Sequence, residues 1–156
     1  MNTSEVDHIL NKFLPRNHVK YLGVLPRDHS RTLLSSKLDH HHHHHSYPLC
    51  FVSNTQPSSK PGEHWVAFFL SSSDSVEFFD SYGLAPSVYG FFIKPSARNS
   101  FTIQQLDSNV CAHYCIFYLY HRARGKSMYQ IVSSFSRDDL VWNDLSVSRF
   151  VTKLDQ

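Results

Sequence analysis

One apolar stretch, residues 109–120, constrains the fold of this chain more than any other segment. Apolar residues fall on nearly every side of it, which predicts a buried helix. Gly125 lies just past its end as a natural stop, and Ser108 or Asn109 can serve as its N-cap. Cys111 therefore falls in the first turn, where unpaired amides and the helix dipole lower the pKa of a thiol.

Core packing is the alternative interpretation of Cys111, because free cysteine is among the most buried residue types. We interpret the other two cysteines as core. Cys50 lies in a short apolar strand, and Cys115 lies one turn further along the same apolar helix. Three cysteines without disulfide spacing favour a reducing setting.

The composition indicates one globular domain spanning residues 1–156, with 41% hydrophobic and 18% charged residues. No apolar run approaches the roughly 18 residues that span a bilayer, and the first 30 residues lack the features of a signal peptide. We therefore expect an intracellular protein, in the nucleus, the cytoplasm or a virion, with no membrane partner. The net charge of +2 is too small to indicate nucleic-acid binding by itself.

Six consecutive histidines occupy residues 40–45. Such a run binds nickel or zinc as a free peptide would, without a folded site. We expect an exposed, dispensable loop here, which is either an inserted purification tag or a tolerated repeat. A physiological metal site is the alternative.

The hydrophobic patterns predict an α+β domain with a mostly antiparallel sheet. Val6, Ile9, Leu10 and Phe13 share one face of a helix that Pro15 ends. Strands are expected at residues 21–25, 49–52, 64–70, 74–80 and 101–106, with a turn at 26–28 and a polar loop at 30–46. Residues 81–100 are expected to be irregular or to carry one short helix. A helix with a capping box is expected from 127, and a last helix carries the apolar residues between 147 and 154.

The predicted hairpin brings a histidine and an aspartate together. A three-residue loop at residues 71–73 would pair Phe68 with Val76 and His64 with Asp80. Directly opposed side chains have Cβ atoms roughly 4.5–5.5 Å apart, so the imidazole and carboxylate could share a hydrogen bond. The carboxylate would then fix the histidine tautomer. A longer loop would shift this register, and a solvated pair at the sheet end is the alternative.

Cys111 adds a nucleophile to this pair. A thiolate beside a histidinium that a carboxylate orients is the arrangement for attack on a carbonyl. The reaction also needs donors for the developing oxyanion. The Cys111 backbone amide is one candidate and the Gln105 side chain is another, with Gln104 as the competing choice.

Four blocks of the sequence resemble a known group of cysteine peptidases. They are residues 62–68 (GEHWVAF), residues 78–83 (FFDSYG), Gln105, and Cys111 six positions after it. Their order of His, Asp, Gln and Cys is that of the adenoviral protease (adenain) and SUMO-protease group. Residues 22–28 (LGVLPRD) are also similar to a segment of adenain-like proteins encoded by viral-type DNA transposons and related viruses.

The resemblance implies a papain-like fold with its cleft between the helix and the sheet. It also implies a thiol peptidase, and we expect no metal or other cofactor. Carried over by position, His64 is the general base, Asp80 its orienting acid, Cys111 the nucleophile and Gln105 the oxyanion donor. Trp65 would pack at the cleft and contribute to substrate binding. Relatives cut viral polyproteins or the C-terminal tails of ubiquitin-like modifiers.

Ala112 departs from the family pattern, which usually has glycine after the nucleophile. A left-handed backbone there would cost alanine on the order of 1 kcal/mol, whereas an ordinary helical position would tolerate it. The compact segment between Asp80 and Cys111 leaves little room to dock a ubiquitin fold. We therefore expect a monomeric endopeptidase with peptide or polyprotein substrates. A deSUMOylase or deubiquitinase-like isopeptidase and a catalytically silent binding module are the alternatives.

Other partners receive weaker support from the sequence. The adenoviral relative uses DNA as a cofactor, but the basic residues within 122–126 are too few to predict that here. Whether the enzyme requires an activating peptide is left open by the sequence. A zinc site on the central helix is not expected, because His113 points to a different face from Cys111 and Cys115.

Overall fold

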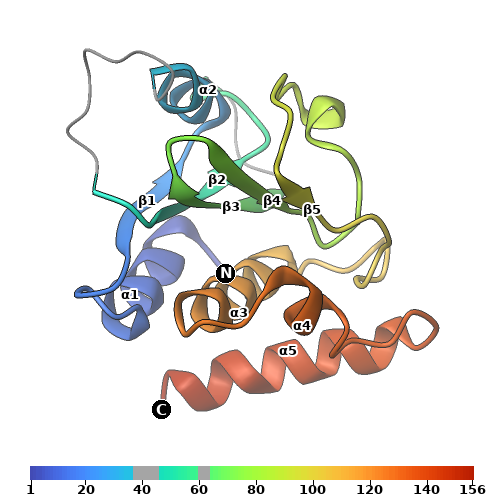
Figure 1. Cartoon of the computed structure of the whole chain (residues 1–156). Coiled ribbons are helices and arrows are strands. Elements are labelled where there is room, and N and C mark those ends of the chain that lie inside the picture. The colour runs from blue at the N-terminus through green and yellow to red at the C-terminus, as the bar shows by residue number, and fades with distance from the viewer. Residues whose placement is uncertain (37–45, 60–63) are drawn as a thin grey trace.

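The computed structural model describes residues 1–36, 46–59 and 64–156. Across these ranges a mixed sheet runs in the order β1-β2-β3-β4-β5, with helices on both of its faces (Figure 1). The three central strands are antiparallel, whereas β1 runs parallel to β2 and β5 runs parallel to β4. The α+β class is confirmed. The strands are β1 (Lys20–Leu25), β2 (Leu49–Asn54), β3 (Trp65–Ser72), β4 (Ser75–Phe79) and β5 (Ala97–Arg98).

Helices cover the sheet unequally on its two faces. One face carries α1 (Thr3–Phe13), α3 (Cys111–Ala123), α4 (Met128–Val132) and α5 (Leu140–Leu154), and the other carries α2 (Arg27–Ser36) and the 3₁₀ helix η1 (Pro86–Tyr89) (Figure 1). Along β3, Ala67 and Phe69 join the larger core with α3, while Phe68 joins the smaller core on the opposite face. Because both faces are buried, the central strands are apolar runs.

The central helix α3 is buried as predicted, with Tyr114, Ile116 and Tyr118 fully enclosed. Its N-cap is Val110, which makes no side-chain cap, so the expectation of a Ser108 or Asn109 cap is wrong. The first amides of α3 are therefore not used by a capping side chain and stay available to other acceptors.

The structure confirms two other helix predictions. α1 buries Val6, Ile9 and Leu10 and ends before Pro15. At the start of α4, Ser127 and Gln130 form the capping box in both directions. None of the helices in the described ranges is long and apolar enough to cross a bilayer.

Two segments differ from their predicted structure. The expected turn at 26–28 and the first part of the expected polar loop form α2, whose Ser30 hydroxyl lies 2.6 Å from the Ser53 hydroxyl. Residues 101–106 form no strand, because the amide of Ile103 donates to the carbonyl of Ser81 in a loop contact rather than in a sheet ladder. The histidine run at 40–45 lies outside the described residues.

The hairpin register also differs from the prediction. Phe68 pairs with Phe78 rather than with Val76, because the turn holds only Ser73 and Asp74 and a bulge follows Leu70. The shift is by an even number of residues, so each side chain keeps its predicted face of the sheet.

Candidate active site

His64 and Asp80 meet at one end of the β3–β4 hairpin. His64 directly precedes β3, and Asp80 directly follows β4. The His64 Nε2 atom lies 2.7 Å from Asp80 Oδ1, although the strand register does not place the two residues opposite each other. Their side chains are only 12% and 0% exposed, so this is a buried pair and not a solvated one.

Asp80 is held as an acceptor by further donors. The amide of Tyr82 donates to its Oδ1 atom and the amide of Leu84 to its Oδ2 atom, both at 3.1 Å. The hydroxyl of Tyr89 donates to Oδ2 at 2.6 Å. A fully buried carboxylate is costly unless its oxygens are satisfied, and here backbone and phenol donors satisfy them.

The backbone of Asp80 is fixed as firmly as its side chain. The buried Asn99 accepts from the Asp80 amide at 3.0 Å and donates to the Asp80 carbonyl. The Gly83 amide donates to the same carbonyl at 2.8 Å, with Gly83 at a φ of +70°. A side chain at Gly83 would have its Cβ 2.3 Å from the backbone carbon of Phe101. The turn therefore requires glycine at this position.

We expect Gly83→Ala to lower the free energy of unfolding by about 2 kcal/mol or more, because strain and a backbone clash combine. Gly125→Ala is the matched control: its φ is +93°, but nothing lies within 4 Å of the added Cβ. The control should lose only about 1 kcal/mol, from strain alone. Urea unfolding of both variants measures the difference, and equal losses would contradict the packing argument.

Two tyrosines flank the His64 imidazole. The Tyr82 ring stacks on it at a centroid distance of 4.7 Å, and the Tyr89 ring lies at 5.4 Å. Sequence reasoning did not identify either residue as part of the site. Tyr82 lies within the motif at 78–83, which could have pointed to it, whereas Tyr89 gives no local signal.

Cys111 is half-buried at the first position of α3, and the His64 imidazole acts on the pKa of its thiol. Because Asp80 engages Nε2, the Nδ1 atom is the nitrogen left for the thiol. Burial acts to raise the pKa of Cys111, but the polarity and charge of His64, together with the backbone amides of Trp65 and Ala112, lower it below its usual value.

The pKa of His64 moves in the opposite direction. Burial acts to lower it, but hydrogen bonds and charges from Asp80 and Cys111 raise the pKa to about 9. A lowered thiol pKa beside a raised imidazole pKa favours a thiolate–imidazolium pair near neutral pH. Burial instead raises the pKa of Cys50 to about 12 and that of Cys115 well above its usual value. Cys111 is thus electrostatically distinct from the other two cysteines.

The two candidate glutamines have different surroundings. Gln104 is 1% exposed, accepts from the Ser81 hydroxyl, and donates through Nε2 to the carbonyl and hydroxyl of Ser108, each at 3.0 Å. Its amide is therefore fully used within the loop. Gln105 is half-buried and donates through Nε2 to Asp144 Oδ2 at 3.1 Å. Within the described ranges this is the only bond of the amide nitrogen, which leaves one of its two hydrogens available there.

Ala112 is an ordinary helical residue. It is the second residue of α3, and all described residues with positive φ are glycines. Ala112 therefore does not adopt the left-handed backbone conformation that would have made alanine unfavourable at this position. Trp65 begins β3, packs partly buried against the larger core, and accepts from the Cys115 thiol through its carbonyl at 3.5 Å.

The basic residues at the end of α3 have structural roles. Arg122 donates from Nε and Nη2 to the Glu77 carboxylate, both at 2.9 Å, and lies over the Phe69 ring. Arg124 lies 3.5 Å from the centroid of the Tyr120 ring. The described part of the chain holds no group of three or more His, Cys, Asp or Glu side chains arranged for a metal ion.

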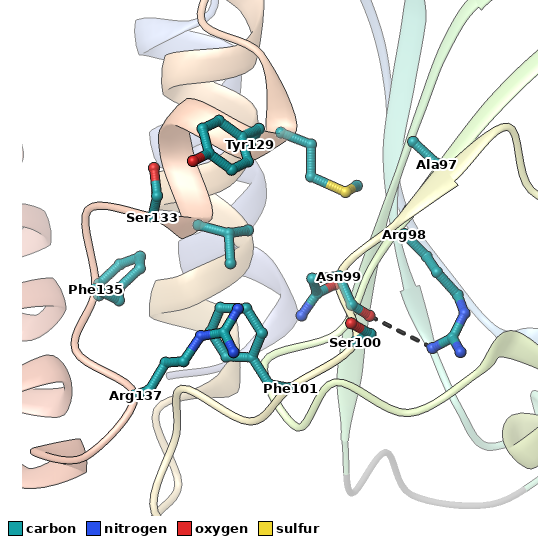
Figure 2. Close-up of a pocket in the computed structure, with 11 residues that line it drawn as sticks. Ala97, Arg98, Asn99, Ser100, Phe101, Tyr129, Ser133, Phe135 and Arg137 are labelled. Carbon is teal, nitrogen blue, oxygen red and sulfur yellow. Dashed lines mark hydrogen bonds between the residues drawn. The ribbon is translucent and has the colours of Figure 1, made fainter.

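A separate hollow of about 580 Å³ lies between β5 with its following loop and α4 (Figure 2). Arg137 stacks on Phe101 at its floor, 3.8 Å from the ring centroid. Asn99, which binds the backbone of Asp80, also lines it. None of the sequence-predicted site residues lines this hollow.

Comparisons with solved structures find similar folds at low sequence identity. The central domain of the uncharacterized Lpg1148 protein from Legionella pneumophila aligns with a TM-score of 0.59 and 14% identity, over 100% of this chain and 98% of that chain. The ASFV pS273R protease aligns with a TM-score of 0.57 and 17% identity, over 91% of this chain and 64% of that chain. Its Se-Met structure aligns with a TM-score of 0.53 and 16% identity, over 92% and 65%.

These similarities show the fold alone: the chain shares its α+β fold with the ASFV pS273R protease and with the Lpg1148 domain. The chain spans less than two thirds of the ASFV protease. No family model matches the sequence, and no curated protein is similar to it. The narrower resemblance to the adenoviral protease stays an expectation from the sequence motifs.

Proposed function

We propose that this chain is a cysteine endopeptidase whose nucleophile is Cys111. One observation carries the proposal: the His64 imidazole hydrogen-bonds to the buried Asp80 at 2.7 Å, and the same imidazole lowers the pKa of the Cys111 thiol. This is the nucleophile, base and orienting acid of covalent acyl transfer. The protease fold is consistent with that chemistry.

In the proposed reaction, the Cys111 thiolate attacks the peptide carbonyl and forms a tetrahedral oxyanion. The amides at the start of α3 and the free N–H of Gln105 would stabilise it. His64 gives its proton to the leaving amine as the C–N bond breaks, which leaves a thioester on Cys111. His64 then takes a proton from water, which attacks the thioester, releases the acid and restores the thiolate.

A peptide-mixture digest tests the proposal. The chain is incubated with an unbiased peptide library, and new peptide termini are identified by mass spectrometry. We expect cleavage at a consistent motif, and loss of cleavage when Cys111 is first alkylated. Processing of a polyprotein would support the viral-type substrate class, whereas processing of SUMO or ubiquitin precursors alone would favour the isopeptidase. A chain that reacts at Cys111 but cuts none of these would favour the binding module.

A further inference from the structure

We propose that Asp144 is a positioning residue, which orients the Gln105 amide toward the oxyanion. This inference rests on the proposed peptidase function. Asp144 lies on α5, far along the chain from the four predicted catalytic residues, and is only 7% exposed. Its Oδ2 atom accepts the Gln105 amide at 3.1 Å.

The other oxygen of Asp144 connects it to the helix that carries the nucleophile. Its Oδ1 atom lies 2.6 Å from the hydroxyl of Tyr114, which is fully buried and lies one turn after Cys111 on α3. Asp144 therefore fixes Gln105 relative to the helix of the attacking sulfur, although Gln105 itself lies in a loop.

The direction of the Tyr114 proton follows from its second neighbour. The phenol oxygen also lies 2.9 Å from the Ile103 carbonyl, which already accepts from the Asn143 side chain at 2.9 Å. A phenol has one proton. Because Asn143 supplies Ile103, Tyr114 can donate its proton to Asp144. Burial and the Asp144 contact raise the pKa of Tyr114 far above its usual value, which keeps that proton in place.

Asp144 is an unusual group to bury at this position. No basic side chain in the described ranges forms an ion pair with it, so neutral donors alone compensate its burial. Packing alone would favour an apolar residue here. An amide held at one N–H cannot rotate freely, and its second N–H then points in a fixed direction. Such preorganisation is what an oxyanion donor requires.

The test compares two reactions of Cys111 that differ in their need for an oxyanion donor. Acylation by p-nitrophenyl acetate passes through a tetrahedral oxyanion, whereas alkylation by iodoacetamide does not. We expect Gln105→Ala to slow acylation about 100-fold and Asp144→Ala to slow it about 10-fold. The double variant should be no slower than Gln105→Ala, because both changes remove the same interaction. Alkylation should stay within about twofold of wild type in all of them.

Two further variants separate positioning from folding. Asp144→Asn keeps an oxygen for Gln105 and should restore acylation to within about threefold of wild type. Asp144→Ser keeps a polar group near Tyr114 but is too short to reach Gln105. It should therefore lose acylation as Asp144→Ala does. This variant replaces Asp144→Ala in the comparison if the alanine variant folds poorly. Asp138→Ala, which removes an exposed carboxylate without a hydrogen-bond partner in the described structure, is the matched control.

Each outcome has a distinct meaning. The positioning role would be overturned if Asp144→Ala or Asp144→Ser acylates at the wild-type rate. It would also be overturned if the losses of the two single variants multiply in the double variant. Neither result would affect the peptidase proposal. A parallel fall in alkylation would assign Asp144 a general structural role and overturn the positioning role as well. A wild-type chain that alkylates at Cys111 but never acylates would instead overturn the peptidase proposal.

Discussion

Cys111→Ala should abolish peptide cleavage while leaving the fold intact. The variant removes the only atom placed to attack a carbonyl in the proposed reaction, and loss of a triad nucleophile costs roughly 10⁶-fold in kcat. Stability should change little, because Cys111 is half-buried and alanine is a good helix former at the start of α3. Mass-spectrometric detection of products, together with thermal unfolding, measures both effects.

Cys50→Ala is the matched control for this variant. It removes the same thiol from a fully buried position in β2, where burial raises the pKa to about 12. We expect a loss of stability from the cavity, on the order of 1 kcal/mol, together with full activity per folded molecule. Cleavage that survives in Cys111→Ala, or disappears in Cys50→Ala, would exclude Cys111 as the nucleophile.

The sequence predicts those parts of the fold that depend on neighbouring residues. The apolar face of α1, the all-round apolarity of α3 and the Ser127 capping box each follow from local spacing. The α2 helix was missed because its sequence is polar and, among residues 27–35, only Ser30 and Leu34 are buried. Its place against the sheet depends on a contact with β2, which is distant in sequence.

The hairpin shows why correct contacts can follow from an incorrect register. Three consecutive serines before Asp74 allow several turns, and spacing cannot select the tight turn and bulge that form. His64 and Asp80 still meet because both lie just outside the strand ends, where their side chains can reach diagonally. His64 and Asp80 are therefore close because both lie at the same end of the hairpin, and the exact strand register matters less.

The supporting residues of the site could not be predicted from local sequence. Tyr89 reaches Asp80 from the 3₁₀ helix, Asn99 from the segment after β5, and Asp144 reaches Gln105 from α5. Each lies in a segment with no motif of its own. Only the folded chain brings these elements together, which is why tertiary structure was needed to find them.

His64→Ala should move the pH dependence of Cys111 alkylation upward. In the wild-type chain the thiol pKa is lowered and the imidazole pKa is about 9, so the thiolate–imidazolium pair forms above the thiol pKa and loses its proton as the pH rises through about 9. Without His64 the burial of Cys111 is no longer offset by a neighbouring cation, and its pKa should rise. At pH 6 the thiolate fraction, and with it the alkylation rate, should fall about 100-fold or more.

Iodoacetamide labelling of all three cysteines across pH 5–10, followed by mass spectrometry, measures this shift. Cys50 and Cys115 serve as internal references, because burial raises the pKa of both in either variant. His113→Ala is the matched control, since His113 lies on the same helix but burial lowers its pKa, the opposite direction from that of His64. That control should keep the wild-type profile. If His64→Ala also keeps it, the thiolate is stabilised by the amides of Trp65 and Ala112 rather than by the imidazole, and His64 is not the base.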